Sequence, residues 1–290
     1  MRLRIDTRRF RVPPNFRVRL HRFDPADTAP FDSSKGARKL LEKYTKELFG
    51  LTELLYAQNR WSVLLIFQAM DGAGKDSAIK QVLRGLDPKA TTVTLFGPPS
   101  PAELAHDYMW RCLKELPQRG RIGIFNRSYY EEVLVTRVHP ELLAAEQVPQ
   151  KGVTSRIWKE RFEDIRDIER YLARNGVVIR KFFLNVSKRE QRRRFLERLN
   201  DPAKKWKFSV NDVKERQRWN DYMVAYEDAI SETSTKHAPW YILPADNKWF
   251  TRLALASIII ETLLELDLRV PDLSHRQRRE LRHAKRRLRG

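Results

Sequence analysis

The residue types best suited to chemistry lie in one short loop, Ala69-Met70-Asp71-Gly72-Ala73-Gly74-Lys75-Asp76-Ser77. A phosphate-binding loop follows the pattern G-x-x-x-x-G-K-[ST], in which backbone N–H groups and a helix N-terminus hold phosphate oxygens while the lysine neutralises them. This loop keeps Gly74 and Lys75 but has Ala69 at the first glycine and Asp76 at the hydroxyl position. It predicts phosphate binding from Gly72 to Asp76, with a plain glycine turn before a helix as the alternative.

Asp71 lies inside this loop, where a carboxylate is unusual. A negative charge among amides that are arranged for anions is electrostatically costly unless a metal ion or an acceptor hydroxyl needs it. Asp71 is therefore a candidate for contact with a metal ion or with the group that accepts a phosphoryl.

A second candidate cluster follows the strand predicted at 121–126, in the segment FNRSYYEEV. In phosphate-loop enzymes the tip of a neighbouring strand carries a carboxylate that holds Mg²⁺. Here that tip is Asn126, for which metal contact and a helix-capping role are equally open. Arg127 offers a planar fork of donors suited to phosphoryl oxygens. Glu131 and Glu132 fall in the first turn of the next helix, where interaction with the helix dipole alone would explain them.

At these residues the sequence resembles the polyphosphate kinase 2 family. The family's form of the loop, G-x-D-x-x-G-K-D, accounts for both Asp71 and Asp76. The resemblance extends in order over residues 35–270 or so and is carried by several further motifs. These are Phe96 with Pro99-Ser100, His106-Asp107-Tyr108-Met109-Trp110-Arg111, FNRSYYEEVLVTRVHP, the stretch from Ser187 to Phe195, Lys205-Trp206-Lys207-Phe208 and Ala238-Pro239-Trp240-Tyr241.

The resemblance implies reversible, Mg²⁺-dependent transfer of the terminal phosphoryl group of inorganic polyphosphate to ADP or GDP, and also to AMP or GMP, with Mn²⁺ as an alternative metal. It implies that Asp71 coordinates the metal and orients the acceptor, that Lys75 holds the transferring phosphoryl group, and that Arg127 stabilises the transition state. Ala69 and Gly97 depart from the family pattern, and Asn126, a second candidate metal ligand, stands where many relatives have Asp. The residues expected near the nucleotide are Asn126, Arg127, Tyr130, Glu131 and Glu132.

The basic segment 187–219 is the candidate lid, because it holds twelve Lys or Arg against five Asp or Glu. Polyphosphate carries about one charge per phosphate, so a groove lined with Lys and Arg suits it. The alternative is a solvated helix face on which Glu190 and Glu197 pair with the basic side chains. The expected polyphosphate contacts in this segment are Arg189, Arg193, Arg194, Lys205 and Lys207.

The elements that position these residues alternate along the chain. Short apolar or β-branched runs predict strands at 61–69, 91–96, 121–126, 177–186 and 240–244. Apolar periodicity predicts helices at 36–56, 101–116, 155–175, 188–199, 211–231 and 248–268, besides the one that follows the phosphate loop. We therefore expect an α/β chain with the three-layer α/β/α fold of phosphate-loop kinases, a parallel five-stranded sheet, a helical lid, and chemistry at the carboxyl ends of the strands.

The chain has 290 residues and a formal net charge of +20. Residues 1–20 hold seven Arg against one Asp, and residues 275–290 hold eight Lys or Arg against one Glu. The expected division is a basic N-terminal arm over 1–34, a phosphate-loop kinase domain over 35–274 with a lid at about 187–219, and a basic C-terminal tail over 275–290. Both ends are interpreted as solvated arms, with capture of a polyanion as the alternative.

Other classes of protein fit less well. No apolar run approaches the ~18 residues needed to cross a bilayer, and the single cysteine, Cys112, excludes an intrachain disulfide. We therefore expect a cytoplasmic protein without membrane association. A dimer or tetramer is expected in addition. A nucleic-acid-binding protein is supported only by the charge, because no recognition motif is present. A kinase that uses ATP to phosphorylate a small metabolite is the remaining alternative.

Overall fold

A parallel sheet of five strands forms the centre of the computed structural model, which describes residues 5–146, 148–149, 153, 156–203 and 205–289. The strand order is β2-β3-β1-β4-β5, and neighbouring strands pair in parallel. This confirms the parallel five-stranded sheet and all five predicted strands. The strands are β1 (Ser62–Ala69), β2 (Thr91–Leu95), β3 (Ile122–Asn126), β4 (Val177–Asn185) and β5 (Trp240–Pro244).

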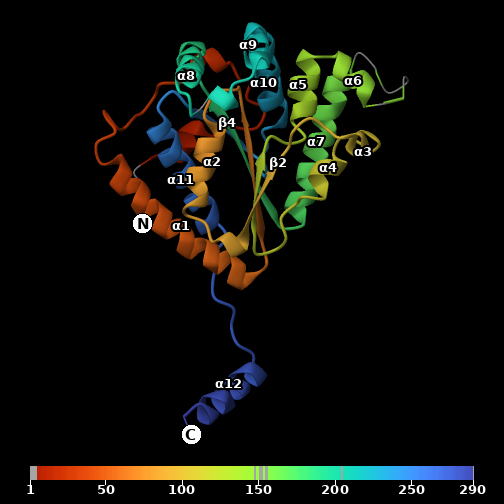
Figure 1. Ribbon diagram of the computed structural model, residues 1–290. Helices are drawn as coiled ribbons and strands as arrows, with labels where there is room; N and C mark the ends of the chain where they lie inside the picture. The colour runs from red at the N-terminus through yellow and green to blue at the C-terminus, as the bar shows by residue number, and fades with distance from the viewer. Residues whose placement is uncertain (1–4, 147, 150–152, 154–155, 204, 290) are drawn as a thin grey trace.

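Helices cover both faces of the sheet, so the three-layer α/β/α architecture is confirmed (Figure 1). One face carries α1 (Ala37–Gln58), α2 (Lys75–Leu83) and α11 (Lys248–Leu264). The other carries α5 (Glu131–Val138), α7 (Ile157–Arg174) and α10 (Trp219–Thr233). Because each strand is followed by a helix that crosses back over the sheet, all carboxyl ends of the strands lie at one edge.

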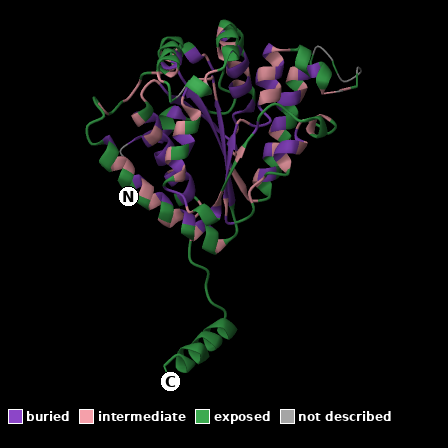
Figure 2. Cartoon of the chain, viewed as in Figure 1, coloured by how far each residue is buried: buried purple, intermediate pink, exposed green. Residues whose placement is uncertain are grey.

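The core lies between these layers, and Figure 2 shows the inner strands as buried. Every residue of β3 and β5 is buried, as are the first seven residues of β1. Near-continuous apolar runs are typical of parallel strands that helices cover on both sides. Strand β2 is at the sheet edge and stays partly exposed, with Leu95 at 69% exposure.

One ion pair is completely buried beneath the sheet. The Nζ atom of Lys181 on β4 lies 2.5 Å from Oε2 of Glu169 on α7 and 2.9 Å from the hydroxyl of Tyr130. The Tyr129 and Tyr130 hydroxyls both donate to Glu169, at 3.0 and 2.9 Å. Each charge thus has several hydrogen-bond partners, which is the condition under which a buried pair is tolerated.

The prediction of a single helix at 101–116 is wrong. Two short helices replace it, α3 (Pro101–Leu104) and α4 (Trp110–Leu113). The predicted cap at Ser100 is confirmed, since its side chain accepts from the Glu103 N–H. The helix then breaks because the Asp107 carboxylate accepts the Met109 N–H at 3.0 Å, a local bond that competes with the helical ladder.

The helix predicted at 211–231 is also interrupted. It consists of α9 (Val210–Gln217) and α10, with Arg218 between them at ψ 20°. The Arg218 N–H bonds to the Glu215 carbonyl three residues back, which tightens the last turn of α9. The remaining elements of this region are α6 (Glu141–Ala145), α8 (Lys188–Asn200) and the 3-10 turn η5 (Lys205–Lys207).

The interpretation of the N-terminal residues as a solvated arm is wrong from Ile5 onward. Ile5, Phe10 and Val12 are buried in the core, and Phe10 packs edge-on against Phe250 of α11. The Val12 N–H also bonds to the Trp240 carbonyl on the open edge of β5, at 2.9 Å. Apolar residues between the arginines therefore fasten this segment to the domain. Its short turns are η1 (Thr7–Phe10) and η2 (Leu20–Arg22), and η3 (Pro88–Ala90) precedes β2.

The C-terminal tail differs from the N-terminal segment. It forms α12 (His275–Arg287), which stands apart from the domain beyond an extended connection (Figure 1). Every described residue from 269 to 289 is exposed. Among the described residues, no helix combines the length and apolar character that a membrane span requires.

Candidate active site

The phosphate loop connects β1 to α2 at the carboxyl edge of the sheet. Gly72 and Gly74 both have left-handed backbones, with φ of 79° and 95°, which only glycine adopts without strain. A Cβ atom at Gly72 would also lie 2.9 Å from the ring of Phe195 on α8. The loop therefore needs both glycines, and α8 packs directly on it.

Helix α8 holds the loop through two polar side chains. Gln191 Nε2 donates to the Asp71 carbonyl at 2.7 Å. Arg194 Nη1 donates to the carbonyls of Gly72 and Ala73 at 3.0 and 2.7 Å. The phosphate loop is thus fixed from outside by the first helix of the predicted lid.

Arg194 does not have the role expected from the sequence. Its Nη2 donates to the carbonyls of Ala245 and Asp246, and its Nε donates to Glu190. With the two bonds to the loop, all five N–H donors of the guanidinium are used. Arg194 is 3% exposed, and it supports the loop rather than offering a free charge to polyphosphate.

Asp71 and Arg127 meet where the phosphate loop faces the tip of β3. Arg127 Nη2 lies 3.5 Å from Asp71 Oδ1, and its Nη1 lies 4.0 Å from Glu131 Oε2. The Arg127 backbone has φ 65°, a left-handed conformation that is uncommon for a residue other than glycine. Its N–H bonds to the Phe67 carbonyl at 3.1 Å, which fixes the turn. Sequence reasoning placed both residues in the site, and the structure brings them together.

Lys75 is the first residue of α2 and faces the same space. Burial, and after it the neighbouring Arg127 charge, lower the pKa of Lys75 to about 8. The charges of Glu131 and Asp71 raise the pKa of Lys75, but they do not offset this decrease. Two cations held this close favour an anion between them.

Asn126 is not the helix cap that the sequence left open, because α5 begins after Tyr130. Its Nδ2 donates to Asp76 Oδ1 at 3.0 Å, and its Oδ1 is buried with no partner among the described residues. An orphaned buried oxygen fits a cation that would complete its coordination.

The fit to Mg²⁺ rests on this oxygen together with the Asp71 carboxylate. Among the described residues, no group of three or more His, Cys, Asp or Glu side chains is arranged to hold a metal ion by itself. Mg²⁺ in kinases is usually held by one or two carboxylates with substrate phosphates as further ligands. The residues present suit a metal that arrives with phosphate.

A cavity of about 350 Å³ opens over the loop, and we call it the phosphate-loop cavity. Sequence reasoning missed Lys80 and Lys248, because neither belongs to a phosphate-loop pattern, and it included Arg198 only as part of the basic segment 187–219. The lining residues are Met70, Asp71, Gly72, Gly74, Lys75, Asp76, Ser77, Lys80, Arg194, Glu197, Arg198 and Lys248.

Several expected polyphosphate contacts lie outside this cavity. Arg193 is exposed and pairs with Glu190 at 2.6 Å and with Glu197, so its charge is already balanced. Arg189 and Lys205 are exposed and do not line the cavity. Lys207 is in η5, and its side chain lies outside the described part of the chain.

A second cavity of about 390 Å³, the α5 cavity, begins on the other side of Arg127. Its walls are mostly apolar and come from the turn after β2, from α5 and from α6. The lining residues are Phe96, Gly97, Pro98, Pro99, Leu104, Arg111, Arg127, Ser128, Glu131, Glu132, Val135, Thr136, Leu142, Ala145 and Glu146.

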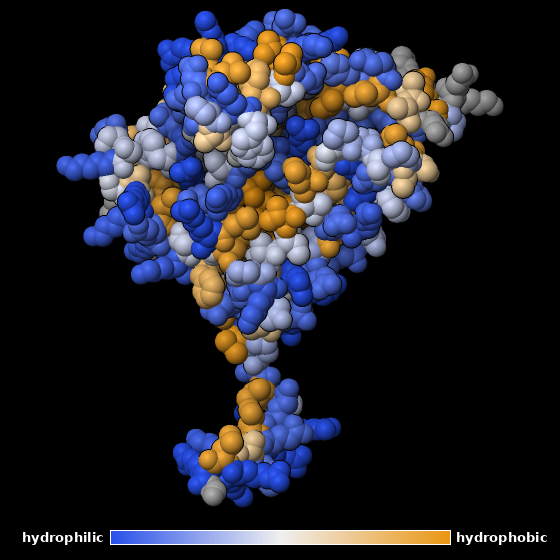
Figure 3. All heavy atoms as spheres, viewed as in Figure 1, coloured by the Kyte–Doolittle hydropathy of each residue, from blue (hydrophilic) through white to orange (hydrophobic). Residues whose placement is uncertain are grey.

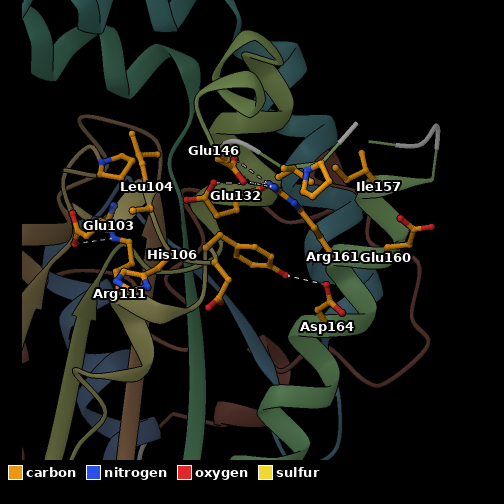
Figure 4. A pocket seen from close by; sticks show the side chains of 16 residues that line it. Glu103, Leu104, His106, Arg111, Glu132, Glu146, Ile157, Glu160, Arg161 and Asp164 are labelled. Atoms are coloured by element: carbon orange, nitrogen blue, oxygen red, sulfur yellow. Dashed lines mark hydrogen bonds and ion pairs between the residues drawn. The ribbon is translucent and has the colours of Figure 1, made fainter. Parts of the chain in front are cut away.

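The α5 cavity continues toward α7 into a further hollow, shown in Figure 4. At the junction Glu132, Glu146 and Arg161 point toward one another, from α5, from the end of α6 and from α7. Arg161 pairs with Glu146 and donates to the Glu132 carbonyl at 2.8 Å. Burial and the nearby Glu146 charge raise the pKa of Glu132 to about 7, although Arg161 opposes the shift.

Tyr130, which is expected near the nucleotide, does not itself line the α5 cavity. Its ring is fully buried and packs against Trp240, and its hydroxyl belongs to the Glu169–Lys181 network. From the segment 126–132, the residues that line the α5 cavity are Arg127, Ser128, Glu131 and Glu132. Two adjacent tyrosines are as well suited to a core as to a ligand, so the sequence alone did not distinguish the two roles.

Most of this chain matches a known protein family. The family model Polyphosphate kinase 2 (PPK2) matches residues 32–269. The chain is 48% identical over 281 residues to the ADP-polyphosphate phosphotransferase of Rhodopseudomonas palustris, covering 96% of this chain and 97% of that protein. It is 44% identical over 265 residues to the AMP/ADP-polyphosphate phosphotransferase of Meiothermus ruber, covering 91% and 95%.

A solved structure gives the same result at the level of the fold. The crystal structure of Polyphosphate Kinase 2 from Arthrobacter aurescens matches with a TM-score of 0.87 at 35% sequence identity. The match covers 97% of this chain and 98% of that one.

Proposed function

The chain belongs to the polyphosphate kinase 2 family, and from this premise we propose that it transfers the terminal phosphoryl group of inorganic polyphosphate to a nucleotide. The observation that carries the proposal is the Asp71–Arg127 pair, which joins a cationic cavity over a phosphate loop to a mostly apolar cavity. A polyanion suits the first, and a nucleoside suits the second.

The phosphate-loop cavity takes the polyphosphate end. Lys75, Lys80 and Lys248 line it, and the α2 N-terminus adds its backbone N–H groups. A base-selective pocket is not evident among the lining residues, whereas cations are abundant. This composition supports a donor made of phosphates alone.

The α5 cavity takes the acceptor nucleotide. Its volume of about 390 Å³ is within the usual range for small-molecule sites, and Phe96, Pro99 and Leu104 offer apolar contact for a base. Arg127 and Glu131 lie at the end of this cavity that adjoins the phosphate loop. The acceptor phosphate would thus point toward Asp71 and Lys75.

Transfer breaks the terminal P–O–P bond of polyphosphate and joins that phosphorus to a phosphate oxygen of the nucleotide. Lys75 and Arg127 offset the negative charge that spreads over the transferring oxygens. Asp71 orients the attacking oxygen, and the shortened polyphosphate leaves along the phosphate-loop cavity. Asp71 and Asn126 would hold Mg²⁺ or Mn²⁺, which supplies neutralisation of phosphate charge when it is bound.

We propose ADP and AMP as acceptors, and GDP and GMP as their guanine counterparts, in a reversible reaction. Relatives are named for ADP and for both AMP and ADP, and a 31% identical relative in Corynebacterium glutamicum is named as a GDP-polyphosphate phosphotransferase, with the qualifier putative in its name. The carboxylates of Glu132 and Glu146 at the far end of the α5 cavity can accept hydrogen bonds from the amino group of either base.

The test is direct. Purified protein with ADP, polyphosphate and Mg²⁺ should produce ATP, measured by luciferase, without any other phosphoryl donor. A chelator should abolish the product, and excess Mg²⁺ should restore it. Production of ATP only after addition of a second nucleotide donor would contradict the proposal. Consumption of ATP with a small metabolite and no polyphosphate would favour the alternative kinase.

Two further expectations stay predictions. The chain is expected to be cytoplasmic, and it is expected to form a dimer or tetramer. Val93 and Leu95 on the edge strand β2 are 45% and 69% exposed, which gives an apolar surface that a second copy would cover (Figure 3). Light scattering during size-exclusion chromatography measures the assembly, and a Leu95→Lys variant should shift it toward monomer.

A further inference from the structure

A row of cations leads away from the phosphate-loop cavity along the surface between α2 and α11. We call it the α2–α11 strip, and it consists of Lys80 and Arg84 at α2 and Lys248 and Arg252 at α11. Lys80 and Lys248 line the cavity itself, whereas Arg84 and Arg252 lie one turn beyond them. Residues four apart lie on the same side of a helix, so each pair continues its helix face by ~6 Å.

The members of the strip lie close enough to influence one another. A Cβ atom added at Gly74 of the phosphate loop would lie 3.6 Å from Cε of Lys248. The pKa of Lys248 is lowered by burial, with Arg194 and Arg252 adding to the shift and Glu197 opposing it. The pKa of Arg252 is lowered by burial and then by Arg84. Lys248, Arg252 and Arg84 therefore form a series that leads from the phosphate loop to the end of α2, and Lys80 lines the same cavity as Lys248.

Among the described residues the strip has few polar partners, and the side-chain bond of Arg84 runs from its Nη1 to Gln81 Oε1 at 3.4 Å. Within the described part of the chain, none of its four side chains forms an ion pair within 4.0 Å. The Nε atom of Arg252 is buried and has no hydrogen-bond partner among the described residues. Arg193 differs in this respect, because Glu190 and Glu197 both pair with it. Clustered like charges that no ion pair neutralises are costly to maintain unless an anion binds.

We propose that the α2–α11 strip binds the phosphates of polyphosphate that follow the reacting end, and so determines how the enzyme depends on chain length. This inference rests on the proposed function. A nucleoside triphosphate or a very short polyphosphate ends within the phosphate-loop cavity, whereas a longer chain has further charges that reach Arg84 and Arg252. The segment predicted as the polyphosphate lid is thereby replaced, in part, by a surface on the opposite side of the loop.

The test uses the double variant Arg84→Gln/Arg252→Gln in the full chain, with tripolyphosphate and a long polyphosphate as donors for ADP. For the long chain KM should rise about tenfold, and the slope of log KM against log salt should fall by about one to two, following the rule of about one unit for each removed phosphate contact. For tripolyphosphate KM should change less than twofold. The single variant Arg84→Gln should give an intermediate effect and covers the case in which the double variant folds poorly, since Arg84 is exposed.

The matched control is Arg170→Gln/Arg174→Gln, which removes the same charge from exposed positions on α7, across the sheet. It should leave both donors unchanged. Equal effects of the two double variants would show a general charge effect and overturn the proposal, as would equal losses with short and long donors. Wild-type protein without activity on either donor would instead contradict the proposed function. A loss of RNA binding by the strip variant, with polyphosphate use intact, would assign the strip to nucleic acid and also overturn the proposal.

Discussion

The phosphate-loop cavity is lined by Asp71 and the α5 cavity by Arg127, so the two spaces meet at this pair while their walls differ in charge and polarity. The first gathers five cations from α2, α8 and α11. The second has an apolar wall with carboxylates toward α7. Both are framed by short loops at the carboxyl ends of parallel strands, so the sheet alone does not explain the difference.

The difference arises from which helices close each space. Helices α2 and α11 approach the loop with their N-terminal turns and bring long basic side chains. Helices α5 and α6 instead present Val135, Leu142 and Ala145, and the turn after β2 adds Phe96. One side of the site is therefore built for charge and the other for a planar apolar group. The predictions below test whether the two sides act separately.

The largest effect is expected at the boundary, where both substrates depend on the same atoms. Asp71→Asn and Lys75→Ala should each lower kcat by about a thousandfold, because catalysis of phosphoryl transfer rests mainly on positioning and charge stabilisation. Circular dichroism and thermal unfolding should remain close to wild type. A variant that kept near wild-type turnover at saturating Mg²⁺ would remove its residue from the catalytic assignment.

A smaller but still large effect is expected when the phosphate loop loses the side chain that supports it. Arg194→Gln removes most of five hydrogen bonds to buried carbonyls and a carboxylate, so it should cost about 3 kcal/mol of unfolding free energy and at least tenfold in polyphosphate use. Denaturant unfolding and KM for polyphosphate measure the two effects.

Arg193→Gln is the matched control for this prediction, since Arg193 is the exposed neighbour. It should change neither stability nor KM measurably, because surface pairs contribute little. Similar losses in Arg193→Gln and Arg194→Gln would mean that both arginines act through their charge, as the sequence predicted, and not by supporting the phosphate loop.

Arg194 also shows what the sequence could and could not predict. The strands and the phosphate loop followed from local patterns, because hydrophobic period and turn residues act over short distances. The site at the carboxyl ends of the strands, where Asp71 and Arg127 meet, followed from the expected parallel sheet. The use of a guanidinium depends on which carbonyls surround it, and these come from residues far along the chain. Lys80, Lys248 and the strip were missed for the same reason, because packing of α2 against α11 brings them together.

The α5 cavity should respond to blockage without affecting the other side. Ala145→Trp at the exposed end of α6 places a large ring in the cavity, and KM for ADP should rise about tenfold while KM for polyphosphate changes little. Ala144→Trp adds the same ring at an exposed position that does not line this cavity, and it should behave as wild type. Comparable increases in both KM values for Ala145→Trp would show that the two spaces are not separate.

A smaller effect is expected from pH, which should act on the use of polyphosphate through Lys75. Lys75 binds phosphate in its protonated form, and its pKa is lowered to about 8. The value of kcat/KM for polyphosphate should therefore be level below pH 7 and fall as pH rises through 8, by about fivefold between pH 8 and pH 9. Because bound phosphate favours the charged lysine, kcat should fall only at higher pH. A profile of kcat/KM that stays level to pH 9.5 would contradict the lowered pKa.

The smallest effect is expected from α12, which lies beyond the family match at residue 269 and is exposed along its whole described length. Deletion of residues 277–290 removes seven Lys or Arg and one Glu, yet none of the lining residues of the two cavities. Activity with tripolyphosphate should be unchanged, because a charge that is solvated and remote is screened within about 10 Å at 0.1 M salt. With long polyphosphate at low salt, kcat/KM should fall at most about twofold, since remote charge raises the rate of encounter and not the stability of the bound state.

The comparison requires short and long donors at two ionic strengths. A loss of short-chain activity in a folded truncated protein would show that the tail completes the phosphate-loop cavity, and the domain would then extend beyond residue 274.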